Sequence, residues 1–506
     1  MGKQAALLIG LLGFIPAGAQ VTFEKYYEAA GTLHGNLHEL SSGNLFTGTA
    51  FMYGTSLMDP QGNILHSQCH LVDTVLVVQS VRKVSDNEFY FATFYAIGAN
   101  GSNPGGHPLL GEMDSLGNVS ILHYFLLNAI FPGGGSGIGD IEVVSDKCVI
   151  AWDRDNRLFL MKADSTLVHV WSRAFDQEGV FHFVKELPNG DLLAGFDLAG
   201  TGASLMRMDA NGNTLWSKRY FGPGSSMHDA VIASDGSVVT VGQVNGMGQK
   251  LFMMKVDGNG LVQWCKGYTG SAWWASPPRI ETALDGNYAV LSSTGSYLTG
   301  TGRSVLFKTD TNGDTLWVRR YGVNGVGYST FDLLVCADGG YAFYGEGYPE
   351  GTYIFKADSL GHVPCSGASP ASFTITELFP VDSAITLTSV DGATTHTGYI
   401  TSTPCQPFNV SDGCTTPGVL DRGATAHKPR IRPNPNTGHF TLEFSDPLAA
   451  DSCYSVYDAL GKLLFQRPLA KGQTSEEIDL SRFGKGTYLV RITSKDGVCN
   501  ERVVVQ

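Results

Sequence analysis

The sequence is poor in charged residues, and it lacks both long apolar runs and the short motifs of common catalytic centres. Charged side chains make up 16% of the 506 residues, against about 25% in an average protein. No stretch reaches the about 18 apolar residues that a membrane-spanning helix needs. The chain has no Cys-x-x-Cys, Gly-x-Ser-x-Gly, His-Glu-x-x-His or Walker A sequence, so zinc-ribbon, thioredoxin, serine-hydrolase, zinc-protease and phosphate-loop sites have no support.

Positive charge is also scarce. The chain has 34 Lys and Arg against 47 Asp and Glu, a formal net charge of -13. Because such a balance repels phosphate, we expect no nucleic-acid partner. Apolar residues reach 43% and aromatic residues 11%, which is enough for packed cores and excludes intrinsic disorder and coiled coil. The 63 Gly and 21 Pro indicate many turns.

The N-terminus has the three parts of a secretory signal peptide. Lys3 supplies the positive charge, residues 5–15 form an apolar run, and small residues end at Ala19. We therefore predict a signal peptide over residues 1–19, cleaved between Ala19 and Gln20. The alternative is a membrane anchor, but the run is too short to cross the bilayer.

Export would permit disulfides, and the chain has nine cysteines, all after the predicted cleavage point. Because nine is odd, at least one must be unpaired or bonded to another molecule. Position within a segment suggests two pairs, Cys405 with Cys414 and Cys453 with Cys499.

A pattern of about ten residues returns seven times along the chain. Its best copies read Lys-Val-Asp-Gly-Asn-Gly-Leu-Val-Gln-Trp at 255–264 and Lys-Thr-Asp-Thr-Asn-Gly-Asp-Thr-Leu-Trp at 308–317. Gly follows the anchor aspartate by three residues in six copies, and Leu167 is the exception. The anchors are 45 to 55 residues apart: Asp59, Asp114, Asp164, Asp209, Asp257, Asp310 and Asp358.

A second landmark, an Asp-Gly turn followed by a β-rich run, recurs between the anchors, as at 235–242, 285–291 and 338–345. Each period thus holds three to four short strands joined by hairpin turns. Seven such units predict a seven-bladed β-propeller over residues 20–365, with a solenoid as the rival. Closure favours the propeller, because residues 23–27 read like the Trp-x-x-x-Tyr strand of an incomplete unit.

These repeats resemble those of secreted bacterial propellers built from Asp-x-x-Gly-Asn-x-x-Trp units. Their turns place Gly at position 4, whereas a calcium loop of the EF-hand type needs it at position 6. We therefore interpret them as structural hairpins, with no metal and no cofactor. One Trp per unit, at 171, 216, 264 and 317, is interpreted as blade packing.

Trp273 and Trp274, which lie shortly before two prolines, are the candidate ligand-binding residues. Exposed aromatic side chains stack on sugars and fill interface pockets. The alternative is that the pair packs between neighbouring blades.

The repeat stops near residue 365, and the composition changes twice. Residues 366–425 are rich in Ser, Thr and Pro and predict a small β connector or an extended linker. Residues 426–506 alternate polar and apolar positions between Gly turns, which predicts a compact antiparallel β-sandwich.

This last segment resembles the type A C-terminal sorting domain of the type IX secretion system of Bacteroidota. The family motif falls on these positions: Pro433, Asn434, Pro435, Gly438, Phe440, Tyr457, Asp458, Gly461, Gly486 and Tyr488. The resemblance implies export through the periplasm to the outer cell surface or the medium, with the secretion machinery and its sortase as partners. It further implies removal of the domain, with the cargo released or attached to lipopolysaccharide. Arg432, Cys453 and Cys499 depart from the family pattern.

Two functions remain open. The first is a non-catalytic surface propeller that binds a glycan or a host protein, because no catalytic constellation is visible and the repeated positions all serve turns and packing. The second is a secreted hydrolase or lyase with its site in the central channel. Acidic residues with raised pKa values in that channel would favour the enzyme, whereas exposed aromatic residues on one rim would favour the binding protein. A purely structural surface component would show neither feature.

Overall fold

The computed structural model divides the chain into two compact units, residues 1–414 and 415–506, which are described separately. It describes residues 20–27, 36–48, 54–72, 74–75, 80–96, 106–126, 138–153, 157–200, 202–244, 250–270, 274–295, 301–322, 326–348, 351–364, 369–390, 394–397, 401–404, 410–412, 430–444, 447–448, 452–458, 463–494 and 497–506. Apart from one short 3-10 turn, the regular structure of these residues is all β, as predicted.

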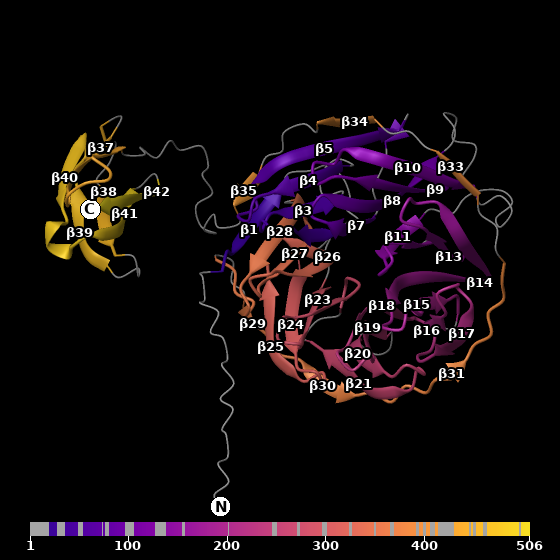
Figure 1. The fold of residues 1–506 in the computed structure, drawn as a ribbon. Helices are drawn as coiled ribbons and strands as arrows, with labels where there is room; N and C mark the ends of the chain where they lie inside the picture. Colours follow the sequence, from indigo (N-terminus) through magenta and orange to yellow (C-terminus); the bar gives the residue numbers. More distant parts are fainter. Residues whose placement is uncertain are drawn as a thin grey trace, which may run out of the picture. The chain divides into compact units, whose positions relative to one another are not determined.

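The described residues of the first unit form seven antiparallel four-stranded groups around a central channel, here called blades 1 to 7 (Figure 1). The first, innermost strands are β2 (Leu37–Glu39), β7 (Ser80–Ser85), β11 (Ile138–Val143), the second half of β14 (His169–Glu186), β18 (Ser225–Ile232), β22 (Arg279–Thr282) and β26 (Gly327–Val335). The second strands are β3 (Leu45–Gly48), β8 (Glu88–Ala96), β12 (Val149–Asp153), β15 (Leu192–Leu198), β19 (Val238–Val244), β23 (Tyr288–Thr294) and β27 (Tyr341–Tyr348).

The two outer positions of each blade follow the same order. The third strands are β4 (Gly54–Met58), β9 (Gly106–Met113), β13 (Arg157–Ala163), β16 (Gly202–Met208), β20 (Lys250–Val256), β24 (Arg303–Thr309) and β28 (Gly351–Ala357). The fourth strands are β5 (Ile64–Val72), β10 (Val119–Leu126), the first half of β14, β17 (Thr214–Arg219), β21 (Val262–Thr269), β25 (Thr315–Tyr321) and β1 (Phe23–Tyr27), and the short β6 (Thr74–Val75) pairs with β5.

The N-terminal strand closes the ring, as the sequence predicts. β1 pairs antiparallel with β28 and so supplies the fourth strand of blade 7. The Tyr27 hydroxyl donates to the carbonyl oxygen of Gly62 in blade 1 at 2.7 Å. The same bond recurs between other neighbouring blades, from Tyr220 to Gly260 at 2.8 Å and from Tyr321 to Gly361 at 2.7 Å. The strand at residues 23–27 therefore forms the fourth strand of blade 7 and bonds to the next blade, as the Trp-x-x-x-Tyr strand does in other blades.

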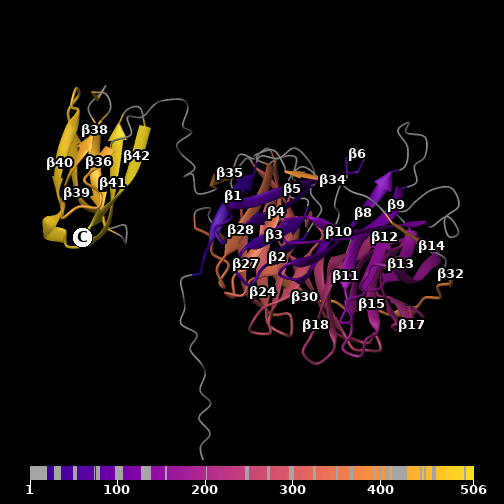
Figure 2. The same ribbon diagram turned by 45° about the horizontal axis from the view of Figure 1, so that its top comes forward.

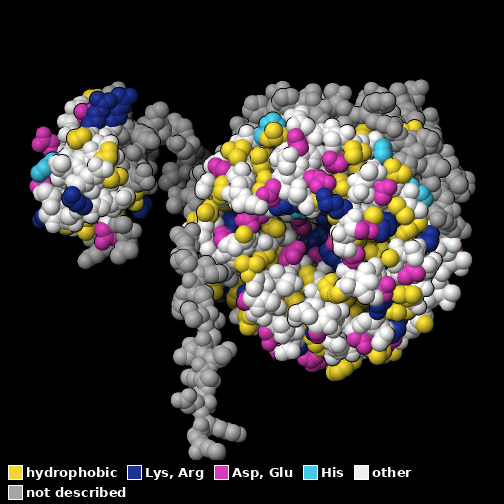
Figure 3. Space-filling model, viewed as in Figure 1, with side chains coloured by type: hydrophobic (Ala, Val, Ile, Leu, Met, Phe, Trp, Pro, Cys, Tyr) yellow, Lys and Arg dark blue, Asp and Glu magenta, His cyan; other side chains and the backbone are white. Residues whose placement is uncertain are grey.

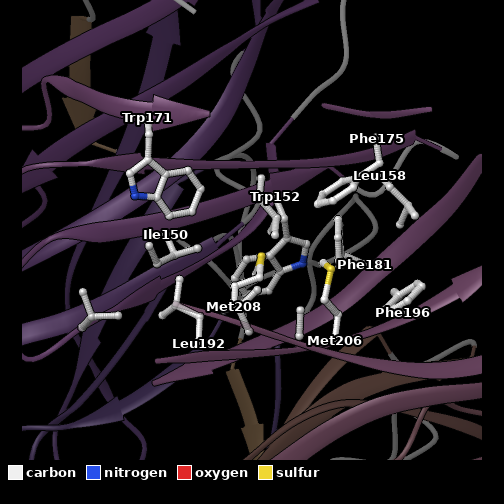
Figure 4. Packing of buried hydrophobic residues seen from close by; sticks show 14 of the residues in the cluster. Ile150, Trp152, Leu158, Trp171, Phe175, Phe181, Leu192, Phe196, Met206 and Met208 are labelled. Carbon is white, nitrogen blue, oxygen red and sulfur yellow. The ribbon is translucent and has the colours of Figure 1, made fainter. Parts of the chain in front are cut away.

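Seven buried apolar clusters fill the interfaces between successive blades, including the interface of blade 7 with blade 1. In the cluster between blades 3 and 4, Trp152 lies beside Met206 and Phe181 (Figure 4). The core of the unit is thus a circle of interfaces rather than one central core.

The repeated turns are held by their own aspartates. Asp209 accepts the backbone N–H groups of Asn211 and Asn213, both at 2.9 Å. Each of the other six anchors accepts the same two N–H groups, two and four residues ahead. The interpretation of these turns as structural hairpins is therefore confirmed.

The repeated tryptophans face the next blade because a β-bulge precedes them. The register shifts at Val170, Leu215 and Leu316, each directly before a Trp, and these bulged side chains are exposed. The indole of Trp216 then donates to the carbonyl oxygen of Gly258 in the next blade at 3.3 Å. The blade-packing role predicted for the tryptophans is thus confirmed.

The segment predicted as a connector forms a belt around the ring, defined here as residues 369–412. Its short strands pair antiparallel with the outer strands of blades 6, 5, 4, 3, 2, 1 and 7 in turn (Figures 1 and 2). They are β29 (Ser369–Pro370), β30 (Thr374–Glu377), β31 (Ser383–Ala384), β32 (Ser389–Val390), β33 (Thr394–Thr397), β34 (Thr401–Pro404) and β35 (Val410–Asp412). The belt runs against the blade order of the chain and adds a fifth strand to every blade.

The second unit consists of two small antiparallel sheets around its own core. One sheet contains β36 (Arg430–Arg432), β37 (His439–Glu443) and β40 (Ser475–Asp479). The other contains β39 (Leu463–Leu469), β38 (Ser452–Tyr457), β41 (Gly486–Ser494) and β42 (Gly497–Val505), and the 3-10 turn η1 spans Ser481–Phe483. Side chains of both sheets, among them Phe440, Val456 and Val490, share one buried cluster, as expected of a sandwich.

Candidate functional site

The innermost strands place side chains in the channel at two fixed positions. One lies six residues, and the other four residues, before the first residue of the turn that leads to the second strand, as Arg279 and Glu281 lie before Asp285. Successive positions of this parity share one face of a strand. A pocket of about 230 Å³ lies between them, and its lining comes from all seven first strands or the residue just before them: Asn36, Leu37, His38, Arg82, Glu142, Lys185, Asp229, Arg279, Glu281, Asp332, Leu333 and Leu334.

The side chains at the first position tie neighbouring blades together. Asp229 accepts the backbone N–H of Ile280 in blade 6 at 3.1 Å. Asp332 accepts the N–H of Leu37 in blade 1 at 2.8 Å, and Asn36 accepts that of Val81 in blade 2 at 3.2 Å. These groups are therefore fixed in place, and they close the ring at the channel as well as at its rim.

The cationic side chains of the pocket are largely engaged. Arg82 pairs with Asp140 at 2.8 Å and lies 3.7 Å from Glu142, which is also 3.7 Å from Lys185. Burial opposes the charge of Lys185, but Glu142 and other carboxylates outweigh it and raise the Lys185 pKa. Both signs of charge meet around the central opening in Figure 3.

The Arg279 guanidinium occupies a separate place in the pocket, on blade 6. Its Nε donates to the carbonyl oxygen of Phe331 at 2.8 Å. Burial raises the pKa of Asp332, and the positive charge of Arg279 opposes that rise. His38 bonds through Nε2 to the Val81 carbonyl oxygen at 2.9 Å, and burial lowers the His38 pKa to about 4, so it is neutral at physiological pH.

Glu281 is the carboxyl group of the pocket that keeps its proton. Its burial, followed by the negative charges of Asp229, Asp332 and Glu142, raises its pKa to about 8. Within the described residues, its side chain forms neither a hydrogen bond nor an ion pair. The pocket thus offers a neutral acid that can donate a proton, beside carboxylates and cations that can bind polar groups.

Of the candidate ligand pair from the sequence, the structure describes Trp274. Trp274 is 1% exposed, and its Nε1 donates to the Tyr268 carbonyl oxygen at 2.9 Å. Its ring packs on Phe307 of blade 6 and on Phe373 of the belt. Trp274 is thus a buried packing residue, as in the alternative considered from the sequence, and not an exposed aromatic residue. Trp273 lies outside the described residues.

The sorting-domain positions lie in the second unit, where several of them have structural roles. Gly438 has φ +103°, and a Cβ there would lie 2.8 Å from the Ser481 backbone. Asn434 accepts the N–H of Val504 at 2.9 Å, which ties the Pro-Asn-Pro segment to the last strand. The Tyr488 hydroxyl donates to the backbone oxygens of residues 483 and 484. Gly461 lies outside the described residues.

Other predictions meet the structure only in part. Ala19 lies outside the described residues, whereas Gln20 donates through Nε2 to the Asp338 carbonyl oxygen of blade 7 at 2.6 Å. Cys453 is a free thiol, so the suggested Cys453–Cys499 disulfide is wrong. Cys405 and Cys414 lie outside the described residues, and Cys69 is disulfide-bonded.

Sequence analysis missed the channel residues. Their identities differ from blade to blade, so no repeated letter marks them. The one available signal is their fixed distance from the Asp-Gly turns, which would have aligned Asp140, Asp229 and Asp332 with Arg279.

Comparisons with known proteins found one matching family and several similar solved structures. Residues 430–506 match the family described as secretion system C-terminal sorting domain. No curated protein matches the chain. The chain is similar to virginiamycin B lyase from Staphylococcus aureus, with 12% identity, 66% of this chain and 98% of that chain covered, and a TM-score of 0.45.

Two further solved structures are similar at comparable identity. For YCF48 bound to D1 peptide, the identity is 11%, the covered shares are 67% and 95%, and the TM-score is 0.43. For PorZ, a surface component of the type IX secretion system of Porphyromonas gingivalis, the identity is 12%, the shares are 93% and 75%, and the TM-score is 0.26. Among the described residues, no helix is long and apolar enough to cross a membrane. The chain is a β-propeller protein that carries a C-terminal sorting domain and is exported by the type IX secretion system to the cell surface or the medium.

Proposed function

We propose that the exported chain is a binding protein whose ligand site is the channel pocket, and that it holds its ligand without transforming it. The observation that carries this proposal is the convergence of side chains from all seven innermost strands on one polar cavity. Strands of a rigid ring position such groups more firmly than loops do. The exposed aromatic site first considered is replaced by this pocket.

The size of the pocket limits what can enter. Its volume of about 230 Å³ is below the about 300–1,000 Å³ of sites for drug-sized ligands. The glycan or protein partner expected from the sequence would therefore present one sugar unit or one terminal residue to the channel. Leu37, Leu333 and Leu334 supply a small apolar wall, and charged groups supply the rest.

A second candidate is the secreted hydrolase or lyase, and one observation favours it. Glu281, with a pKa of about 8, is protonated at neutral pH as a general acid must be. Glu142 stands in the same pocket in contact with Arg82 and Lys185. An acid and a carboxylate in one cavity meet the criterion set from the sequence for an enzyme.

The test is a glycan array and a peptide library probed with the mature chain, residues 20–506. The Leu334→Trp variant would fill the pocket, and Leu284→Trp makes the same change at a leucine that is 68% exposed outside it. Binding that is lost in the first variant and kept in the second supports the proposal. Equal binding by both variants would contradict it.

Recovery of the ligand separates the two candidates. The binding protein returns its ligand chemically unchanged after long incubation. If the wild-type chain converts the ligand and the Glu281→Gln variant does not, the result would favour the enzyme instead.

A further inference from the structure

We propose that the channel pocket recognises a cationic group, an organic ammonium or guanidinium carried by a small ligand or by the end of a larger one. This inference rests on the proposed binding function and names the chemistry of the ligand at that site. It follows from the way charges are distributed and paired around the channel.

The pocket and its nearest ion-pair partner hold more negative than positive charge. The cations are Arg82, Lys185 and Arg279, and the carboxyl groups are Asp140, Glu142, Asp229, Glu281 and Asp332. Ion pairs join Arg82 and Lys185 to Asp140 and Glu142, and the positive charge of Arg279 opposes the rise that burial causes in the Asp332 pKa. Among the described residues, Asp229 and Glu281 have no cation within ion-pair distance.

Three carboxyl groups of the pocket lie on one side of the channel. Asp229, Glu281 and Asp332 come from blades 5, 6 and 7, which are consecutive. Asp229 accepts the backbone N–H groups of Ala230 and Ile280, at 2.9 and 3.1 Å. These bonds fix the Asp229 carboxylate next to the strand that carries Glu281.

The surroundings of Glu281 favour its protonated form, and burial contributes more to this than the neighbouring charges do. Burial is the largest cause of its raised pKa, and the charges of Asp229, Asp332 and Glu142 add to it, while Lys185 acts in the opposite direction. A bound ammonium or guanidinium would supply the positive charge and let the proton leave. It would also donate hydrogen bonds to carboxylate oxygens in charge-assisted form.

The arrangement of the side chains in the pocket favours an organic cation over a metal ion as the ligand. Within the part of the chain that the structure describes, no three His, Cys, Asp or Glu side chains converge closely enough to hold a metal. An ammonium or guanidinium group has N–H donors that point in several directions and can reach carboxylates that stand apart. Anionic ligands would compete with Asp140 and Glu142 for Arg82 and Lys185.

The test compares matched probes that differ in charge. Calorimetric titrations of the mature chain near neutral pH would use glucosamine, glucose and glucuronate, with agmatine as a probe that is not a sugar. We expect glucosamine or agmatine to bind at least about tenfold more tightly than glucose and glucuronate, which corresponds to about 1.4 kcal/mol. Glu281→Gln should weaken this binding by a similar factor. Glu377→Gln, at an exposed position of the belt, should leave it unchanged.

Three outcomes would overturn the inference while the proposed function stands. The first is that glucuronate binds more tightly than glucosamine and agmatine. The second is that glucosamine and glucose bind equally and Leu334→Trp abolishes the binding of both, and the third is that the wider screen yields an uncharged ligand whose binding Leu334→Trp abolishes. If neither the probes nor the screen bind at the pocket, the proposed function fails as well. Binding of either cation that Glu281→Gln weakens and Glu377→Gln does not would support the inference.

Discussion

The glycine three residues after an anchor aspartate meets two requirements at once. Gly260 has φ +71°, a conformation that side chains rarely adopt, and a Cβ there would lie 2.8 Å from the Trp216 ring. Its carbonyl oxygen also accepts the Tyr220 hydroxyl at 2.8 Å. The turn of one blade is therefore the surface on which the preceding blade packs.

Replacing this glycine should cost more than its backbone angle alone explains. For Gly260→Ala, we expect the free energy of unfolding to fall by about 3 kcal/mol, because strain at positive φ adds to overpacking against Trp216. Gly236→Ala is the matched control, since Gly236 has φ +77° but open space around its Cβ position, and should cost about 1 kcal/mol. Urea unfolding of the mature chain measures both. Equal losses of stability in the two variants would show that the close approach to Trp216 does not add to the cost of the substitution.

Glu281 should make stability depend on pH. Its pKa is about 8 in the folded chain against an ordinary value of 4.5, so between these values the folded state binds more protons than the unfolded state. Stability is therefore greatest toward the lower end of this window and falls as pH rises through it. In Glu281→Gln the free energy of unfolding should fall by about 4 kcal/mol less across this window. Urea unfolding at the two ends of the window measures this, and the same pH slope in both proteins would contradict the assignment.

At the scale of elements, the belt protects the outer edge of every blade. An unpaired edge strand is a template for pairing with other chains, and β29 to β35 occupy the seven edges. The belt also contributes apolar anchors. Phe373 packs on Tyr268 and Phe307, and Ile385 packs against the cluster between blades 3 and 4. We infer that the belt stabilises the ring both through its hydrogen bonds and through these side chains.

Breaking one belt contact should loosen the edge locally. The N–H of Leu378 donates to the Cys265 carbonyl oxygen at 2.9 Å, and Leu378→Pro removes this donor. We expect faster amide hydrogen exchange in β30 and β21 and a loss of about 1–3 kcal/mol in stability. Phe379→Ser, at a side chain that is 87% exposed, should change stability by less than about 0.5 kcal/mol. Unchanged exchange in Leu378→Pro would show that the belt pairing is not structural.

Sequence analysis predicts the elements whose residues recur. The hairpin aspartates, the packing tryptophans and the closing strand at residues 23–27 follow from side chains whose chemistry each blade needs in the same place. The belt was not recognised, because its strands are two to four residues long and rich in Ser and Thr, without the alternation of a strand that covers a core. The channel site was missed because its residues do not recur from blade to blade. Arg279 and Asp229, for example, hold equivalent positions but carry opposite charges.

At the scale of the whole molecule, the sorting domain and the ring that contains the proposed ligand site belong to different units. The sorting domain has its own core and forms a separate compact unit, so its loss should leave the ring folded. We expect a chain without residues 430–506 to accumulate in the periplasm, whereas the full chain reaches the surface or the medium. Cell fractionation with an antibody against the ring measures this, and the full-length Glu281→Gln variant is the control that should still be exported. Surface display of the truncated chain would contradict the role of the domain.

The claim that the channel is a ligand site is tested most directly by an NMR titration of the Glu281 carboxyl. The mature chain, labelled at glutamate, would be titrated between about pH 4 and pH 10 with and without agmatine. Our account predicts a pKa of about 8 in the free protein and a lower value when agmatine is bound, because the cation stabilises the carboxylate. A pKa near the ordinary value of 4.5 that agmatine leaves unchanged would contradict it.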